Sequence, residues 1–236
     1  MIRFHQADIV GIQEALAGQV KDLAAGLPDY DWFGVGRDDG HDQGEFMAIF
    51  YLKKRFQVIK QSTFWLSETP EMPGKGWDAA CNRIVTWAEF KDNMTGKVFY
   101  HFNTHFDHMG EIARQESAKL LLKYIKNVAG NSAVIVSGDF NSPPDSPTYQ
   151  ILTQNSKSES EIRLFDTKLV SLNPHHGPDG TFTGFKLSAL TEKSEPIDYI
   201  LVTRNIKVIN HGTLSDTFNG FFPSDHMPVL AEIVID

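Results

Sequence analysis

The chain has 236 residues, of which 41% are hydrophobic and 22% charged, and its formal net charge is −8 at pH 7. These proportions are those of a globular protein and argue against a disordered or fibrous chain. No apolar run approaches the ~20 residues that cross a bilayer, and no targeting segment is recognised. The acidic balance argues against broad contact with duplex DNA. The single cysteine, Cys81, excludes an intrachain disulfide and a cysteine-based zinc site.

The N-terminal segment Met1–Gln6 resembles the last turn of an amphipathic helix and runs straight into an apolar stretch. We therefore expect the domain to be N-terminally incomplete, lacking a first strand and most of a helix. Asp8–Glu14 follows as a short apolar run, typical of a strand buried on both faces. Ala15–Leu27 then has leucine and valine at helical spacing and predicts a helix.

The rest of the chain alternates between strand-like and helical patterns. Aromatic and β-branched runs predict antiparallel strands at Tyr30–Val35, Phe46–Leu52, Phe56–Phe64, Ile84–Phe90 and Val98–Thr104. Helices are then expected at Glu111–Val128 and Ser146–Thr153, strands at Ala133–Val136, Ile197–Val202, Lys207–Ile209 and Val229–Ile235, and loops at Ser156–Glu161 and His175–Gly184. With no repeat or linker, this order predicts one domain over residues 1–236, with two strand-rich halves and outer helices.

Polar residues recur where the predicted strands begin or end. They are Glu14, His105, Asp139, Asn141, Asp198, Asp225 and His226. Because the ends of neighbouring strands lie close in space, these side chains are expected to share one cleft although they are distant in the sequence.

The segment Gly138–Asn141 has a chemical logic of its own. Alternation along a strand points Asp139 and Asn141 the same way, while Phe140 packs behind them. The carboxylate suits the activation of an attacking water, and the amide suits donation to a phosphate oxygen. Taken alone, however, the segment is more typical of a strand followed by an Asx turn than of a site.

The other positions also have structural interpretations. Glu14 can be a favourable charge at a helix N-terminus, and Asp225 can cap a turn. His105 and His226 can be half-buried histidines with local hydrogen bonds. Asp198 is harder to explain in this way, because a carboxylate beside a core strand needs a partner.

Taken together, these residues form a resemblance. Gln-Glu, Thr-His-Phe-Asp, Gly-Asp-Phe-Asn, Ile-Asp-Tyr and Ser-Asp-His occur in this order, each at a strand edge. The chain resembles the exonuclease–endonuclease–phosphatase superfamily, to which deoxyribonuclease I belongs, from Asp8 to the C-terminus. Its Gly34–Gly40 and Gly44–Phe46 segments resemble a bacterial branch with poorly defined substrates. The resemblance implies an α+β fold, a four-layer α/β/β/α sandwich of two packed, mostly antiparallel sheets with outer helices.

The resemblance also implies roles for the matched residues. Glu14 and Asp225 correspond to carboxylates at a metal ion, Asp139 to the residue that activates water, and Asn141 to a phosphate-contacting amide. His226, held by Asp198, corresponds to the histidine opposite the phosphate. His105 corresponds to a second histidine on the phosphate oxygens, Glu45 to its carboxylate partner, and Arg83 to a phosphate-contacting arginine. The family's asparagine on the first strand has no match.

The implied activity is water-driven hydrolysis of phosphoesters, either diesters or monoesters, dependent on a divalent metal. An oxygen-only metal site favours Mg²⁺ or Mn²⁺ over Zn²⁺. The substrate is expected to be a phosphorylated small molecule, lipid or nucleic acid, and the enzyme a soluble monomer, although an exported parent stays open. The unmatched asparagine motivates an alternative, namely a weak or inactive domain that binds phosphorylated ligands.

Overall fold

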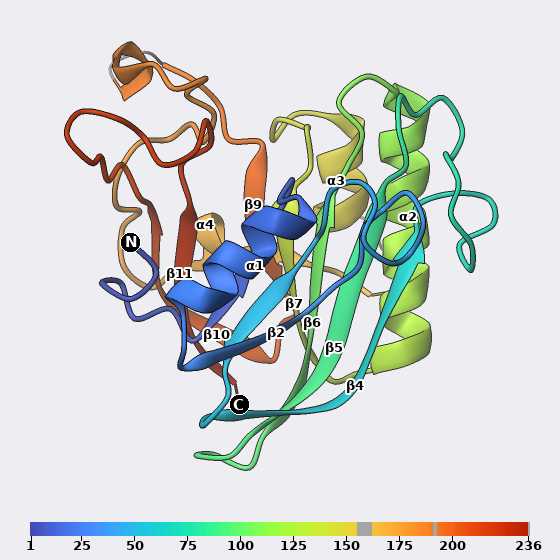
Figure 1. Cartoon of the computed structure of the whole chain (residues 1–236), viewed down its shortest axis with the longest axis horizontal. Coiled ribbons are helices and arrows are strands. Elements are labelled where there is room, and N and C mark those ends of the chain that lie inside the picture. Colours follow the sequence, from blue (N-terminus) through green and yellow to red (C-terminus); the bar gives the residue numbers. More distant parts are fainter. Residues whose placement is uncertain (155–161, 191–192, 236) are drawn as a thin grey trace.

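Two β-sheets face each other, and helices cover their outer sides, so that the molecule has four layers (Figure 1). The computed structural model describes residues 1–154, 162–190 and 193–235. The layered order confirms the expected α/β/β/α sandwich. The predicted loop at Ser156–Glu161 lies outside the described residues. No described helix is long and apolar enough to span a membrane.

The larger sheet has six strands in the order β4-β5-β6-β7-β9-β8. Their bounds are β4 Phe56–Trp65, β5 Ile84–Asp92, β6 Val98–His105, β7 Ala133–Asp139, β8 Phe165–Asp166 and β9 Asp198–Val202. β6 and β7 pair in parallel, whereas the other neighbours pair antiparallel. A parallel pair needs a crossover, and α2, Glu111–Ala129, supplies it across the outer face of the sheet.

The facing layer consists of a three-stranded and a two-stranded part. The first has the order β1-β3-β2, with β1 Ile9–Gly11, β3 Ile49–Leu52 and β2 Tyr30–Phe33. The second pairs β10, Ile206–Thr213, with β11, Val229–Ile235. The remaining helices are α1 Ala17–Gly26, α3 Pro147–Gln154, α4 Thr167–Val170 and a 3₁₀ turn, η1, at Leu187–Leu190.

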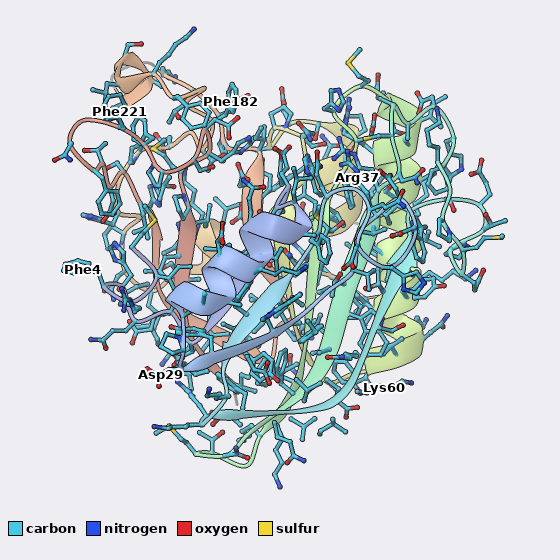
Figure 2. The ribbon with its side chains drawn as sticks, viewed as in Figure 1. Phe4, Asp29, Arg37, Lys60, Phe182 and Phe221 are labelled. Atoms are coloured by element: carbon cyan, nitrogen blue, oxygen red, sulfur yellow. The ribbon has the colours of Figure 1, made fainter. Side chains whose placement is uncertain are left out.

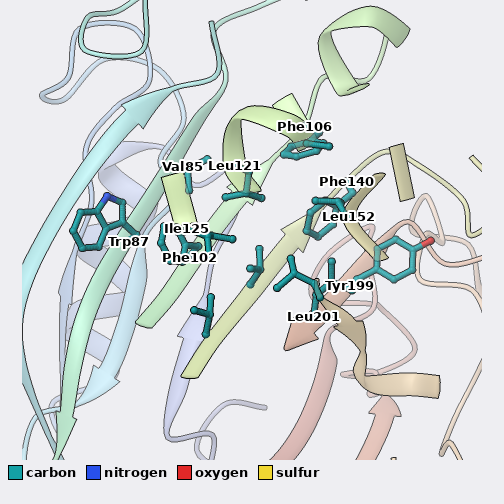
Figure 3. Close-up of a cluster of buried hydrophobic side chains, with 14 of the residues drawn as sticks. Val85, Trp87, Phe102, Phe106, Leu121, Ile125, Phe140, Leu152, Tyr199 and Leu201 are labelled. Carbon is teal, nitrogen blue, oxygen red and sulfur yellow. The ribbon is translucent and has the colours of Figure 1, made fainter. Parts of the chain in front are cut away.

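Alternation along β5 explains how its two faces are buried. Val85 and Trp87 belong to the apolar layer that packs against Leu121 and Ile125 of α2 (Figure 3). Phe90, on the other face of β5, belongs to the core between the sheets. Removing such a side chain from water contributes roughly 1.5–3 kcal/mol, so these two apolar layers hold the sandwich together.

The face of β6 that points between the sheets changes character along the strand. Phe99 is apolar and fully packed, His101 and Asn103 are buried and polar, and His105 ends the strand. The inter-sheet space is therefore hydrophobic at one end and polar at the other. The polar end is where the predicted site residues gather.

The predicted elements are largely confirmed, but some bounds differ: β7 runs on to Asp139 and β10 covers Ile206–Thr213. The strand expected from Phe46 begins only at Ile49, because Phe46 instead forms isolated bridges with Ala15 and Gly36. The short elements β8 and α4 were not expected. β8 has two residues and α4 has four, too few for a hydrophobic period to be visible in the sequence.

Candidate active site

Three of the predicted residues lie in one row across adjacent strands. His105 at the end of β6 pairs in register with Asp139 on β7, and Asp139 pairs with Asp198 at the start of β9. Residues that are level on neighbouring strands share a face of the sheet, so these three side chains converge. His226, from the segment before β11, joins the row. The expectation that strand ends bring these residues together agrees with this geometry.

His226 contacts both carboxylates of the row. Its Nδ1 donates to Asp198 Oδ2 at 2.8 Å, and its Nε2 lies 3.9 Å from Asp139 Oδ2. Burial acts to lower the pKa of His226, but the hydrogen bond and charge of Asp198, with the charge of Asp139, outweigh it and raise the pKa to about 9. The imidazole is therefore charged at neutral pH and can donate a hydrogen bond or a proton.

Asp139 is buried, and its carboxyl titrates at an unusual pH. Burial and the charge of Asp198 raise its pKa to about 7, against the opposing effects of the Asn141 N–H and His226. A carboxyl with a pKa near the working pH suits a general base. The Asn141 N–H donates to Asp139 Oδ1 at 2.8 Å, so the Asx turn is present and orients this same carboxylate. The two interpretations of Gly138–Asn141 are therefore compatible.

His105 is nine-tenths buried or more and stays neutral. Burial, assisted by nearby cations, lowers its pKa well below the ordinary value. His105 Nε2 lies 3.0 Å from Asn141 Nδ2 and 3.3 Å from Asp139 Oδ2. Asn141 Nδ2 also donates to Phe106 O, and because an amide nitrogen only donates, Nε2 accepts from it and Nδ1 carries the proton. Nδ1 has no hydrogen-bond partner among the described residues and lies 3.6 Å from Glu14 Oε1.

Two glutamates face each other beside His105. Glu14 follows β1 in a left-handed conformation, with φ of 62°, and its side chain is 56% exposed. Glu45 comes from the loop before β3 and forms an ion pair with Arg37. One oxygen of each glutamate and one nitrogen of His105 lie within 4.8 Å of one another. Burial raises the pKa of Glu45, Arg37 opposes this shift, and Glu14 adds to it.

Arg83 and Asp225 have other contacts. Arg83 is buried, its Nε donates to Asp107 Oδ1 at 3.2 Å, and its Nη2 lies 2.9 Å from His108 Nδ1. The Asp225 carbonyl accepts from Thr183 N at 2.7 Å. Asp225 also belongs to none of the three clusters of close acidic, imidazole or thiol groups in the described part of the chain. The roles expected for Arg83 and Asp225 stay predictions.

The sequence interpretation missed Asn103, which ties the two sheets together behind the site. It is fully buried and accepts from Gln13 Nε2 at 2.6 Å, while its own Nδ2 donates to Ile12 O at 2.9 Å and Ala48 O at 3.0 Å. These bonds fix the end of β1, and with it Glu14, over β6. The available signal was the strand period, which places Asn103 on the same face as His105.

The glutamate pair fits a hard divalent cation. Glu14 and Glu45 bring carboxylate oxygens close together, and like charges at this separation repel unless a cation lies between or beside them. Carboxylate oxygens are the ligands that Mg²⁺ and Mn²⁺ prefer. The protonated Nδ1 of His105 is not a ligand in this state, so the two carboxylates are the groups that fit the ion.

Comparison with known proteins finds one matching family model and similar solved structures from bacteria. A family model described as "Endonuclease/Exonuclease/phosphatase family" matches residues 1–226. An endonuclease/exonuclease/phosphatase from Bacteroides vulgatus is 42% identical, with a TM-score of 0.93, over 100% of this chain and 87% of that one. A mannosyl-6-phosphatase from Bacteroides thetaiotaomicron is 39% identical, with a TM-score of 0.90, over 100% and 88% of the two chains.

A more distant structure shares the fold. The human nocturnin catalytic domain, solved with a bound sulfate anion, is 20% identical over 100% of this chain and 83% of that one, with a TM-score of 0.74. The two Bacteroides relatives are bacterial, as the resemblance of the glycine-rich segments suggested. Members of this family are phosphoester hydrolases. From the family match and the Bacteroides structures it follows that the chain belongs to the endonuclease/exonuclease/phosphatase family.

Proposed function

We propose that this protein is a divalent-metal-dependent phosphoester hydrolase. The observation that carries the proposal is the row His105–Asp139–Asp198, closed by His226. It sets a carboxyl that titrates near neutral pH beside an imidazolium, within 3.9 Å. Both pKa values are raised, that of Asp139 to about 7 and that of His226 to about 9, so near neutral pH the carboxylate can accept a proton while the imidazolium can donate one.

The roles follow from the protonation states. Asp139 orients a water molecule and takes its proton, while His226, held charged by Asp198, donates toward the phosphate or the leaving oxygen. The Asn141 N–H orients Asp139, and the Asn141 side-chain amide holds neutral His105 through Nε2. Glu14 and Glu45 hold Mg²⁺ or Mn²⁺, with Asp225 as a further candidate ligand. When bound, the metal stabilises the negative charge that develops on the phosphate oxygens.

A phosphorylated sugar is the first substrate to test. The support is the mannosyl-6-phosphatase of Bacteroides thetaiotaomicron, which is 39% identical along the whole of this chain. The net charge of −8 is a poor match for duplex DNA. Phosphorylated lipids and single nucleotides belong in the same panel.

The test measures hydrolysis of mannose 6-phosphate, p-nitrophenyl phosphate and bis-p-nitrophenyl phosphate with Mg²⁺ or Mn²⁺, and then with EDTA. We expect turnover that EDTA abolishes. Asp139→Asn and His226→Ala should each reduce kcat/KM by roughly 10²–10⁴-fold, the usual contribution of an acid or base. Asp145→Asn, an exposed carboxylate in the following loop, is the matched control and should leave the rate unchanged.

Two results would count against the proposal. Metal-dependent turnover that survives in both variants would remove the assigned roles. Mg²⁺ binding by calorimetry without turnover of any ester would instead favour the alternative of a domain that binds phosphorylated ligands.

A further inference from the structure

The loop between β2 and β3 is folded so that one arginine has a fixed position. The Arg37 N–H donates to Glu45 O at 3.1 Å, closing the loop across its base. A Cβ added to Gly36 would lie only 2.2 Å from Gln43 O, so this crossing requires glycine. The backbone on both sides of Arg37 is therefore held in place.

The Arg37 carbonyl is anchored from the neighbouring sheet. It accepts from Trp65 Nε1 at 2.7 Å and from Asn82 Nδ2 at 3.3 Å. With its carbonyl bound on that side, the side chain turns toward the site, where its Nη1 donates to Glu45 Oε2. Figure 2 shows Arg37 in the upper part of the view, where the loop passes in front of the large sheet.

The Arg37 guanidinium is paired with one member of the cluster formed by Glu14, Glu45 and His105. Glu45, its ion-pair partner, has an oxygen within 4.8 Å of both a Glu14 oxygen and a His105 nitrogen. The positive charge of Arg37 also contributes to the lowered pKa of His105, after burial and Arg83. The charge of Arg37 therefore acts electrostatically on His105 in the site.

Arg37 has donors to spare, in contrast to Arg83. A guanidinium carries five N–H groups. Arg83 is 4% exposed and is bound to both Asp107 and His108. The Arg37 side chain is 14% exposed, and its Nε is buried without an acceptor among the described residues. Nη1 donates to Glu45, which leaves Nη2 as the donor for a ligand. A ligand oxygen in the site can therefore bind Arg37 without displacing a protein partner.

The strength of the interaction between Arg37 and a substrate depends on the charge of the substrate's phosphate group. A phosphomonoester is a dianion above its second pKa of about 6, whereas a phosphodiester is a monoanion. Arginine binds phosphate oxygens through parallel N–H bonds, and these are stronger to the more highly charged group. We propose that Arg37 is a specificity-determining residue that selects phosphomonoesters over phosphodiesters. This proposal rests on the proposed hydrolase function.

The test compares two substrates with the same leaving group, p-nitrophenyl phosphate and bis-p-nitrophenyl phosphate, at pH 8 with saturating Mg²⁺. Arg37→Gln should lower kcat/KM for the monoester by about 10–100-fold, because a charged hydrogen bond is lost. The factor by which it lowers kcat/KM for the diester should be at least about ten times smaller. Arg37→Lys, which keeps the charge without the fork, should fall between. Arg55→Gln removes an arginine paired with Asp8 and Asp92, away from the site, and should change neither rate.

Equal losses on both esters would overturn the proposal, because an arginine that only positions Glu45 would affect both reactions alike. A second measurement separates this outcome from failure of the hydrolase function. Calorimetric binding of inorganic phosphate and of dimethyl phosphate, with Mg²⁺ at pH 8, requires no turnover. Arg37→Gln should weaken phosphate binding and leave dimethyl phosphate binding nearly unchanged; unchanged phosphate binding would again overturn the selectivity.

Discussion

At the residue scale, the site depends on charges that are set by direct neighbours. His226 is charged because Asp198 accepts its Nδ1–H, whereas His105, only one strand away from Asp139, is neutral because it is buried among cations. Two histidines of one site are therefore in different protonation states at neutral pH. This difference supports the proposed role of His226 as the proton or hydrogen-bond donor.

The Asp198–His226 pair predicts a pH dependence. The pKa of His226 is raised to about 9, so the imidazolium persists up to that pH, and a rate that needs it should fall as pH rises through about 9. Asp198→Asn removes the charge that raises this pKa, so the alkaline limb of kcat/KM should move to lower pH.

A proton NMR titration of the His226 ring in the metal-free protein measures this pKa without an activity assay. The pKa should be lower in Asp198→Asn than in the wild type. Asp179→Asn, an exposed carboxylate that pairs with Lys168, is the control and should leave the titration in place. An alkaline limb that stays near the same pH in Asp198→Asn would show that His226 is not the group that titrates.

At the element scale, the parallel pairing of β6 with β7 sets His105 beside Asp139. The Cβ of an alanine at position 138 would lie 2.1 Å from Thr104 O on β6, so Gly138 permits this close approach. A side chain there would push β7 away from β6 and carry Asp139 with it. The glycine before Asp139, the proposed general base, therefore has a structural reason.

Gly138→Ala is expected to lower the free energy of unfolding by about 1–3 kcal/mol, the usual cost of overpacking, and to reduce turnover. Urea denaturation and the phosphoester assay measure the two effects. Gly18→Ala in α1 is the matched control, because nothing lies within 4 Å of its added Cβ. There alanine should be neutral or stabilising by up to about 1 kcal/mol. Equal stability of the two variants would contradict the close approach.

Most elements were predictable because their patterns are local. The strand period of β5 and the helical stripe of α2 were visible in the sequence, and both elements lie where expected. β8 and α4 could not be found, because they are held by contacts with distant segments. Phe165 pairs with Val202 of β9, and Thr167 Oγ1 at the start of α4 donates to Ile200 O at 2.8 Å.

At the scale of the whole molecule, the polar layer between the sheets makes stability sensitive to acid. Burial lowers the pKa of His101 to about 4, and burial together with nearby charges lowers that of His211 to about 4. Unfolding restores a pKa near 6.5, so the unfolded chain binds more protons between these values. The stabilising contribution is complete above pH 6.5 and is lost as the pH falls toward 4.

His101→Gln should reduce the slope of the free energy of unfolding against pH by up to about 1.4 kcal/mol per pH unit, the value for one titrating group. Urea unfolding at several pH values between 7.5 and 4.5 measures the slope. The exposed His41, replaced in the same way, should leave it unchanged. A slope that is identical in the wild type and in His101→Gln would mean that His101 does not stay neutral in the folded protein.

Local patterns in the amino-acid sequence were enough to name the candidate residues for the chemistry and the strand face on which each one lies. Asp139, Asp198, His105 and His226 were named from motifs at strand ends, because alternation and turn chemistry are local properties. The tertiary structure alone decided the register His105–Asp139–Asp198, the ion pair of Arg37 with Glu45 and the neutral state of His105. Those features depend on pairing, burial and charge between residues far apart in the chain, where a slip of one residue would turn each side chain to the opposite face.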